Sequence, residues 1–575
     1  MNKRLLLLLT IFLMALQAGI SQVIIPAGNV SGCWTKLNSP YYIDGEITIP
    51  PDSTLVIERG VKVKFKGHYG FIVRGQLLAV GTPKDSIIFT CDSNNTLLSW
   101  KGIKFMNNYS LDTSRIIYCK IEHGKNYFGP ALGDSSGGAI YVNSFSKLII
   151  SNSTICNCSA DRWGGGIYCS YCSPVITNNT IRNNSSTYWN GGGLALYFSN
   201  AKLFNNTITS NYAQGQGGGI CCYSSCPVIK ENIFNNNTST WGPPAILLAE
   251  GSHAYINKNR ITNNHSSMGS CGIDCVNSNP LISGNILTRN SGVGGGVIDL
   301  GGSTAVIINN IICNNSGIVA ISCTDASPTF INNTICNNDN SPGGISIEIY
   351  DNSSPVFINT IIWNNTALFT DNRIDFYDSS CVPDFYNCDI AGGINSLISA
   401  AGATYTGIFE NNINADPEFV SPTAGTGSAY DGLMADWSLL ETSPCINAGT
   451  IDTSGLHLPA IDYAGNPRIF QNRIDIGALE SQQNISIDEK MFNNPFIIYP
   501  NPSNGKIFLI LDNPCKENLK LEITRTNGEL VYSKNMKKKT SKIVEQIDLY
   551  DYSNGLYFIK VTGKNSVMVE KIIKE

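Results

Sequence analysis

Apolar residues recur through the middle of the chain in short runs, and each run is followed by asparagine. The recurring string consists of an apolar residue, which we call the anchor, then two further positions and then a polar corner, which is mostly asparagine. Successive anchors are 23 to 27 residues apart. A period of roughly 20 to 50 residues indicates a solenoid, a propeller or another repeat array. The anchors are Ile155, Ile181, Ile208, Phe234, Ile261, Leu287, Ile312, Ile335 and Ile362.

Two further markers keep step with these anchors. A proline or alanine lies seven residues before most of them, and a glycine cluster followed by an apolar residue opens most units, as in Gly164–Ile167. Each unit therefore contains three short β patterns separated by Asn or Gly corners, and no amphipathic helix pattern. The sequence predicts an all-β fold, a right-handed parallel β-helix whose rungs pair only with their neighbours.

The composition fits this fold. The chain has 65 asparagines and 54 glycines among 575 residues, and only 14% of its residues are charged, against about 25% in ordinary domains. Asparagine tolerates the left-handed corner conformation, and equivalent amides in stacked rungs, about 4.8 Å apart, can form ladders. The net charge of −5 argues against a nucleic-acid partner, which calls for a basic surface.

Nineteen cysteines are present, an odd number. Cys169-x-x-Cys172 is typical of half a zinc site, but a convincing second half is missing, so no metal and no cofactor is predicted. Cysteine alternates with aliphatic residues at one repeat position, which predicts small buried side chains. Disulfides stay open, because Cys313 and Cys336 share one register in adjacent rungs. The alternating position holds Val142, Cys169, Leu196, Cys222, Leu248 and Cys275.

The N-terminus carries the pattern of a secretory signal peptide. Lys3 and Arg4 precede the apolar run Leu5–Ala15, which is too short to span a bilayer. We expect residues 1–21 to be the signal, with cleavage before Gln22; cleavage after Ala18 also fits. No later run is long enough for a transmembrane helix.

The segments on either side of the repeats predict caps. Residues 22–124 hold strands without the Asn repeat, and Trp34, Ile47–Pro50 and Gly60–Phe65 resemble the N-terminal region of secreted β-helix proteins. We expect a cap and the first rungs there, and the repeats over residues 125–400. Residues 401–484 resemble the "choice-of-anchor" segment that follows many bacterial β-helices, which implies a C-terminal cap. The matching stretches are Asp416-Pro417, Asp436-Trp437, Ser443–Thr450 and Asp475–Ala478, and Arg468 with Asp475 predicts a structural ion pair.

The last segment, residues 485–575, differs in charge. It holds 14 of the 39 basic residues against 11 acidic ones, and its alternating strands predict a small immunoglobulin-like β-sandwich with a turn at Asn527-Gly528. It resembles the C-terminal sorting domain of type IX secretion cargo. This implies the type IX machinery as partner and export through the periplasm to the extracellular space or outer-membrane surface. An ordinary immunoglobulin-like module is the alternative. The resemblance rests on Tyr499, Pro500, Asn501, Pro502, Gly505, Gly555, Tyr557, Lys571 and Lys574.

Acidic residues offer weak candidates for catalysis. Parallel β-helices include polysaccharide lyases, glycoside hydrolases and adhesins, so the fold does not decide the function. Asp274 and Asp299 lie near the same strand in successive rungs, with Glu250 and His253 close in sequence. Counted from the apolar residue after each glycine cluster, the positions of Asp274 and Asp299 differ by one place. This predicts that the two aspartates point to opposite faces. Solvated strand residues are therefore the favoured interpretation.

Aromatic residues favour binding instead. Trp163, Trp189 and Trp241 lie four or five residues before the glycine-following anchors, and Tyr168 and Tyr197 lie near the first two. Such rings stack on the apolar faces of sugars. We therefore expect a secreted or cell-surface protein that binds extracellular polysaccharide or acts in adhesion. A polysaccharide lyase or glycoside hydrolase of the pectin-lyase-like fold and a passive stalk are the alternatives.

Overall fold

The computed structural model describes residues 23–92, 99–106, 112–127, 135–145, 147–340, 345–366, 372–470, 473–482, 497–512, 518–525, 529–537, 542–563 and 567–575. The expected signal peptide and the turn at Asn527-Gly528 lie outside these residues. The chain forms two compact units, Met1–Gln482 and Gln483–Glu575, and each is described by itself.

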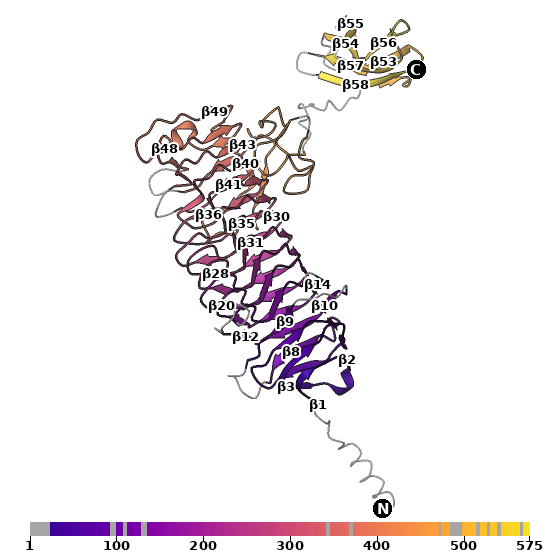
Figure 1. Ribbon diagram of the computed structural model, residues 1–575. Coiled ribbons are helices and arrows are strands. Elements are labelled where there is room, and N and C mark those ends of the chain that lie inside the picture. Colours follow the sequence, from indigo (N-terminus) through magenta and orange to yellow (C-terminus); the bar gives the residue numbers. More distant parts are fainter. Residues whose placement is uncertain are drawn as a thin grey trace, which may run out of the picture. The chain divides into compact units, whose positions relative to one another are not determined.

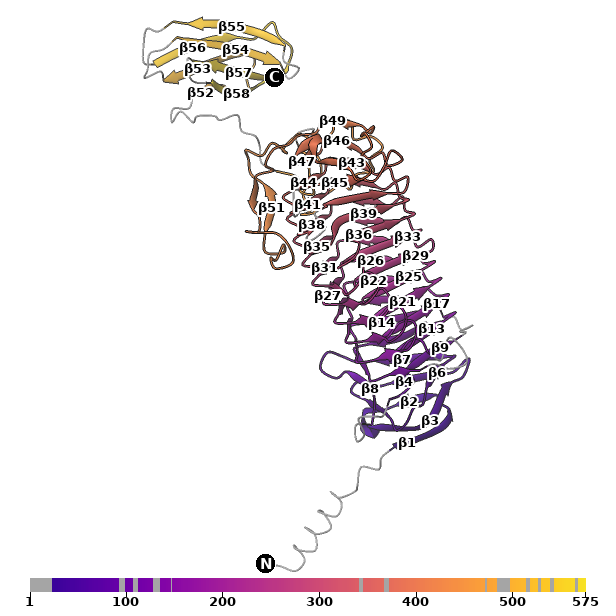
Figure 2. The same cartoon turned by 90° about the vertical axis from the view of Figure 1, so that its left-hand side faces the viewer.

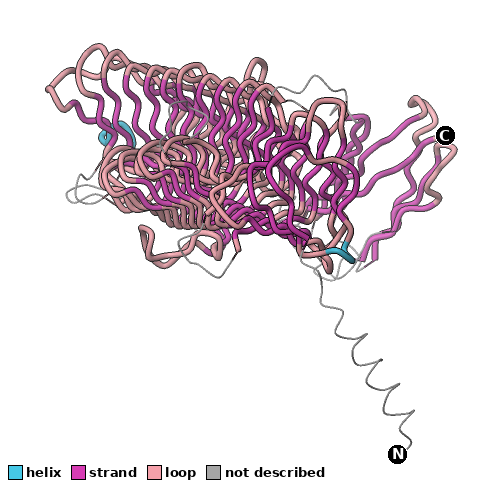
Figure 3. Tube along the Cα trace, turned by 60° about the horizontal axis from the view of Figure 1, so that its bottom comes forward, coloured by secondary structure: helices cyan, strands magenta, loops and turns pink. Residues whose placement is uncertain are grey.

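The first unit is a parallel solenoid of stacked rungs (Figure 1). Each rung contributes one strand to each of three parallel sheets, which we call the first, second and third sheet. Strands β1 (Val23–Asn29) and β3 (Tyr41–Ile49) open the stack and run through the third and the first sheet. Figure 3 shows the rungs following one another along the unit.

The strands of each sheet pair in parallel with their neighbours in the stack. The first sheet contains β6 (Phe71–Val73), β9 (Ile103–Met106), β13 (Ile140–Asn143), β17 (Ile167–Ser170), β21 (Leu194–Tyr197), β25 (Ile220–Tyr223), β29 (Ile246–Ala249), β33 (Ile273–Val276), β36 (Gly296–Gly301), β39 (Val319–Thr324), β42 (Ile347–Tyr350), β45 (Ile374–Phe376) and β48 (Leu397–Ser399). The second sheet contains β2 (Gly32–Trp34), β4 (Thr54–Ile57), β7 (Gln76–Val80), β10 (Ser114–Ile117), β14 (Leu148–Ser151), β18 (Val175–Thr177), β22 (Lys202–Phe204), β26 (Val228–Lys230), β30 (Tyr255–Asn257), β34 (Leu281–Ser283), β37 (Val306–Ile308), β40 (Thr329–Ile331), β43 (Val356–Ile358), β46 (Asp384–Tyr386) and β49 (Phe409–Glu410). The third sheet contains β5 (Lys62–Phe65), β8 (Ile87–Cys91), β11 (Cys119–Glu122), β15 (Thr154–Cys156), β19 (Thr180–Arg182), β23 (Thr207–Thr209), β27 (Ile233–Asn235), β31 (Arg260–Thr262), β35 (Ile286–Thr288), β38 (Ile311–Cys313), β41 (Thr334–Cys336), β44 (Ile361–Trp363) and β47 (Asp389–Ile390). Short strands beside the loops are β12 (Lys125–Asn126), β16 (Ser159–Ala160), β20 (Ser185–Ser186), β24 (Tyr212–Ala213), β28 (Thr238–Ser239) and β32 (His265–Ser266).

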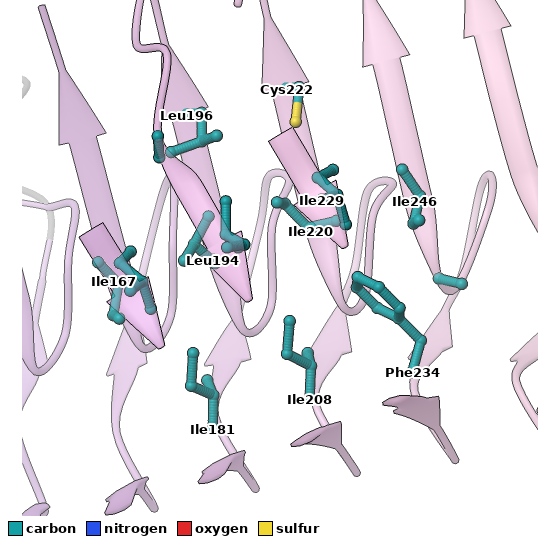
Figure 4. Close-up of a cluster of buried hydrophobic side chains, with 14 of the residues drawn as sticks. Ile167, Ile181, Leu194, Leu196, Ile208, Ile220, Cys222, Ile229, Phe234 and Ile246 are labelled. Carbon is teal, nitrogen blue, oxygen red and sulfur yellow. The ribbon is translucent and has the colours of Figure 1, made fainter. Parts of the chain in front are cut away.

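The apolar anchors of the repeat form the core. From Ile155 to Ile362 all nine pair in register along the third sheet, so the predicted repeat is confirmed. Figure 4 shows Ile181, Ile208 and Phe234 pointing toward residues of the facing strands, and these three side chains are fully buried. Since rungs repeat, one continuous apolar interior runs through the stack.

Asparagine has two roles at the corners. In a pair such as Asn183-Asn184, the first residue takes the left-handed conformation, with φ of 54°, and its side chain is exposed. The second points inward, and Asn184 Nδ2 donates to Asn211 Oδ1 at 3.0 Å, which repeats from Asn211 to Asn237 at 3.0 Å. The predicted amide ladders are therefore present. One ladder runs from Asn179 to Asn333 and the other from Asn184 to Asn372.

The end of the core is covered by the last two strands and the loop between them. Leu397 of β48, Phe409 of β49, and Ala403 and Tyr405 of the loop pack against it. Residues 414–482, which we call the flank segment, then fold back along the outside of the third sheet, where β51 (Asp436–Leu439) lies beside the rungs (Figure 2). This segment also contains β50 (Phe419–Ser421), which pairs with β51.

The flank segment is docked through asparagine amides and a buried tryptophan. Asn332 Nδ2 donates to Asp475 O at 2.9 Å, and Asn314 Nδ2 donates to Gly425 O at 3.0 Å. Trp437 packs over Cys313 and Cys336, which are fully buried. These two cysteines lie on the outer face of the third sheet and are buried there by the flank segment.

The predicted ion pair of Arg468 has a different partner. Arg468 Nη2 donates to Glu480 Oε2 at 2.8 Å, and both side chains are almost fully buried. The Asp475 carboxylate accepts the backbone N–H groups of Asn447 and Ser481 at 2.6 and 2.7 Å. Asp475 therefore meets Arg468 only through its carbonyl oxygen, at 3.3 Å.

The second unit is a small antiparallel sandwich, as predicted. One sheet has β52 (Ile497–Tyr499), β53 (Lys506–Asp512) and β56 (Lys542–Asp548), and the other has β54 (Leu519–Arg525), β55 (Leu530–Met536), β57 (Gly555–Thr562) and β58 (Val567–Lys574). Ile507, Leu521 and Ile559 belong to its separate core. The only helical elements in the described part of the chain are the short 3-10 turns Lys36–Asn38 and Gly393–Ser396, so no helix there could cross a membrane.

Candidate functional site

The outer face of the first sheet carries the candidate site. Because strand side chains alternate, Ile167 and Cys169 of β17 point into the core while Tyr168 and Ser170 point out. Successive rungs place their outward side chains in columns along the stack. The column through Tyr168 holds Tyr141, Tyr168, Ala195, Cys221, Leu247, Asp274, Asp299, Ser322, Glu348 and Asp375. One half of this face is therefore apolar and aromatic, and the other half is acidic.

Six rings gather at the apolar half and form what we call the aromatic platform. Its members are Trp163, Trp189, Tyr197, Tyr223, Tyr171 and Phe198. The Trp163 ring centroid lies 5.7 Å from that of Trp189, 6.4 Å from that of Tyr197 and 6.1 Å from that of Tyr223. The rings of Tyr171 and Phe198 stack at 5.2 Å with an interplanar angle of 5°. Since Trp189 and Tyr171 are 45% and 55% exposed, the platform faces the solvent.

Three of the five predicted ligand-binding residues meet in this platform. These are Trp163, Trp189 and Tyr197. Trp241 is 58% exposed and lies two rungs beyond Trp189, about 10 Å along the stack, with Gly215 hydrogen-bonded between them. Tyr168 is only 9% exposed and packs in an apolar cluster with Ala195 and Leu247. Tyr168 therefore supports the platform from below and offers no free ring.

Tyr171 and Phe198 were missed from the sequence. Both occupy the turn after a strand of the first sheet in the left-handed conformation, with φ of 51° and 47°. Bulky residues are rare there, and the pattern predicts only a turn. Arg162 adds a guanidinium 5.9 Å from the centroid of the Trp189 ring, within the range of a cation–π contact.

The prediction that Asp274 and Asp299 point to opposite faces is wrong. The two residues pair directly between β33 and β36, so they are neighbours on one face. The error comes from Gly294–Val297, where two apolar residues follow the glycines. Ile298, not Val297, aligns with the anchor Ile273, which moves the register of Asp299 by one place. An aligned carboxyl pair is therefore present.

Burial disfavours the ionised form of both carboxyls. It raises the pKa of Asp274 well above its ordinary value, and the neighbouring Asp299 charge raises it further. Burial also raises the pKa of Asp299. Asp274 accepts a hydrogen bond from the Ser270 hydroxyl. Two neighbouring carboxyls with raised pKa values are of the kind that general acid–base catalysis uses.

Two more acids extend the column. Burial raises the pKa of Glu348 and of Asp375. Tyr350 donates to Glu348 Oε1 at 3.2 Å, and Arg373 forms a two-point ion pair with Asp375 at 2.5 and 2.7 Å. These contacts give the acidic half its own hydrogen-bond network.

Glu250 lies away from the acidic column. It occupies the turn after β29, with φ of 52°, and its side chain is exposed. The nearby His253 accepts the backbone N–H of Asn279 at 3.0 Å. Within the described residues, no three side chains of His, Cys, Asp or Glu are grouped so that they could hold a metal ion.

Comparisons with known proteins bear on both units. The family model described as "Right handed beta helix region" matches residues 45–239, 187–335 and 230–390, together more than half of the chain. The model described as "Secretion system C-terminal sorting domain" matches residues 497–575. "Protein bark beetle" of Drosophila melanogaster is 39% identical over 62 residues, which is 11% of this chain and only 2% of that protein.

Two solved structures are similar at low level. The crystal structure of pectate lyase Pel9A has 12% identity and a TM-score of 0.26, covering 75% of this chain and 88% of its own. The DFA-IIIase from Arthrobacter chlorophenolicus A6 has 11% identity and a TM-score of 0.20, covering 63% and 89%. Both likenesses are too low for an activity to be transferred.

Proposed function

The chain belongs to the right-handed β-helix family and is a secreted or cell-surface protein of the type IX pathway, and we propose that it binds an extracellular glycan. The observation that supports this proposal is the aromatic platform. Three of its rings, Trp189, Tyr171 and Phe198, are exposed. The platform spans successive rungs and rests on the buried layer of Tyr168, Ala195 and Leu247.

The repeat spacing suits a polymer. Rungs follow at about 4.8 Å, so a chain lying along the stack would meet a ring at successive sugars. Apolar sugar faces stack on such rings, and Arg162 beside Trp189 can donate hydrogen bonds to hydroxyls. Trp241, two rungs farther on, would extend the binding surface.

Export completes the proposal. Residues 1–21 would act as the signal peptide into the periplasm. The sorting domain would then engage the type IX translocon, which leaves the β-helix outside the cell or on the outer-membrane surface.

The test is binding of the secreted chain to a polysaccharide array, with Trp163→Ala plus Trp189→Ala as the perturbation. An aromatic stacking contact contributes about 0.5–1.5 kcal/mol, so we expect the loss of two rings to lower the affinity about 5- to 160-fold. The matched control is Tyr255→Ala, an exposed ring of β30 in the second sheet. Unchanged binding in the double variant, or an equal loss in the control, would contradict the proposal.

A second function is supported by the carboxyl pair. Asp274 and Asp299, aligned in neighbouring strands and shifted toward protonation, could serve as acid and base of a glycoside hydrolase or polysaccharide lyase. Release of reducing ends from neutral or acidic polysaccharides, abolished by Asp274→Asn and by Asp299→Asn, would establish it. Glu250→Gln is the control, since Glu250 lies in an exposed turn. Absence of product from every polysaccharide that binds would refute it.

A further inference from the structure

The Cys169-x-x-Cys172 motif has no role in the proposed function. Cys169 is the third residue of β17 and points into the core, and Cys172 follows after one turn and is 3% exposed. Both belong to the same buried core cluster, and they lie three residues apart in the chain. The structure therefore places two cysteine side chains in the same part of the core.

The neighbouring rungs show what the second position ordinarily holds. Ser199, Ser225, Ser252 and Ser278 follow Cys172 along the stack, and each hydroxyl accepts the backbone N–H of the preceding rung, at 3.2, 2.9, 3.0 and 3.1 Å. A small polar side chain thus suits this corner, and serine provides it. Cys275 occupies the position of Cys169 in a later rung, and the position of Cys172 is there taken by Ser278. A buried cysteine at the first position therefore occurs without a cysteine at the second.

We propose that Cys169 and Cys172 are joined by a disulfide in the exported protein. Disulfides form and persist in the compartments through which this chain passes. A metal site is the competing use of such a motif, but no third ligand accompanies the pair within the part of the chain that the structure describes.

The bond would form by exchange with the oxidised form of a periplasmic dithiol–disulfide protein. One cysteine thiolate attacks that protein's disulfide and forms a mixed disulfide, and the second thiolate then displaces it. The two electrons and two protons of the cysteine thiols end on the reduced dithiol protein. Because both thiols are buried once the rung has closed, the exchange takes place before the folding of this rung is complete.

The disulfide would fix one edge of the aromatic platform. The four-residue loop that it closes contains Ser170 and Tyr171. Tyr171 is held in the left-handed conformation and stacks on Phe198 of the next rung. A covalent link across this turn restrains a backbone conformation that bulky residues avoid. The disulfide rests on the proposed export of the chain and is independent of glycan binding.

Differential alkylation of the secreted full-length protein tests the bond. The chain is unfolded in guanidinium with iodoacetamide, then reduced, labelled with a second, isotopically heavy iodoacetamide and mapped by mass spectrometry. We expect the heavy label on Cys169 and Cys172 and the light label on Cys275, the matched buried thiol. Light label on both residues of the motif would overturn the proposal.

A Cys172→Ser variant provides the second arm. Serine is the residue of the neighbouring rungs, so the corner keeps its hydrogen bond and the fold is retained. We expect Cys169 to take the light label in this variant. A heavy label on Cys169 there would show a different disulfide partner and would also overturn the proposal.

Discussion

The amide ladder allows a quantitative test at Asn211, which is fully buried in the middle of the stack. Its Oδ1 accepts both the backbone N–H and the Nδ2 of Asn184, each at 3.0 Å. Its Nδ2 donates to Ile181 O at 2.9 Å and to Asn237 Oδ1 at 3.0 Å. The side chain therefore links three rungs.

Asn211→Ala removes these four hydrogen bonds. The buried backbone N–H of Asn184 loses its partner, whereas Asn184 Nδ2 keeps its bond to Ile155 O at 3.0 Å and the Asn237 oxygen keeps the Asn211 backbone N–H as its donor, at 3.1 Å. An orphaned buried polar group costs about 1–3 kcal/mol, and each of the other lost hydrogen bonds contributes about 0.5–1.5 kcal/mol. We expect the free energy of unfolding to fall by about 3 kcal/mol or more.

Urea unfolding followed by tryptophan fluorescence is the suitable assay, because Trp163 and Trp189 flank the affected rungs. The matched control is Asn183→Gly. Asn183 is exposed and left-handed, a conformation that glycine adopts readily, so its change should stay within about 0.5 kcal/mol. If Asn211→Ala were no more destabilising than this control, the ladder would not be what holds the rungs together.

Three further predictions concern buried charges. Burial raises the pKa of Asp389 to about 7 from 3.8. The folded chain keeps a proton that the unfolded chain releases, so up to about 4 kcal/mol of stability is lost as the pH rises from about 4 through 7. Asp389→Asn should flatten this slope in pH-dependent urea unfolding. Arg468→Ala leaves Glu480 buried without its charged partner and should lower the free energy of unfolding by about 3–5 kcal/mol at neutral pH, measured by urea unfolding. An unchanged urea midpoint would contradict the structural ion pair. In the sorting domain the buried Lys574 ammonium donates to two backbone carbonyls. Lys574→Ala should therefore lower both the melting temperature and the secreted fraction. Lys571 is exposed, so Lys571→Ala should leave the melting temperature unchanged.

The fold could be predicted because each level of the sequence agrees with it. Anchors at regular spacing, Asn corners and Gly clusters all specify the same rung, and the nine anchors do pair in register. The position of residues 414–482 could not be predicted this way. They form few strands, and Trp437 is buried by residues more than a hundred positions earlier in the chain, which no local pattern records.

The candidate site was predicted only in part, for two physical reasons. A single residue of register decides the face of a strand, and the double apolar Val297-Ile298 led to the wrong choice for Asp299. The turn that carries Tyr171 and Phe198 needs a backbone conformation that sequence propensity assigns to Asn or Gly. Trp163 and Trp189 were found because they share a loop position in adjacent repeats, which is a periodic signal.

The flank segment has a consequence for how this protein can change through evolution. Its docking partners, Asn314, Asn332 and Asn359 among them, sit in successive rungs and fit donors and acceptors at fixed positions of residues 414–482. Duplicating or deleting a rung beneath it would shift every later contact by one rung spacing, so the number of rungs in that half is locked. The uncovered rungs around the aromatic platform have no such constraint. Lineages should therefore differ in length in the half that carries the platform, and ring number can vary there while the covered half stays constant.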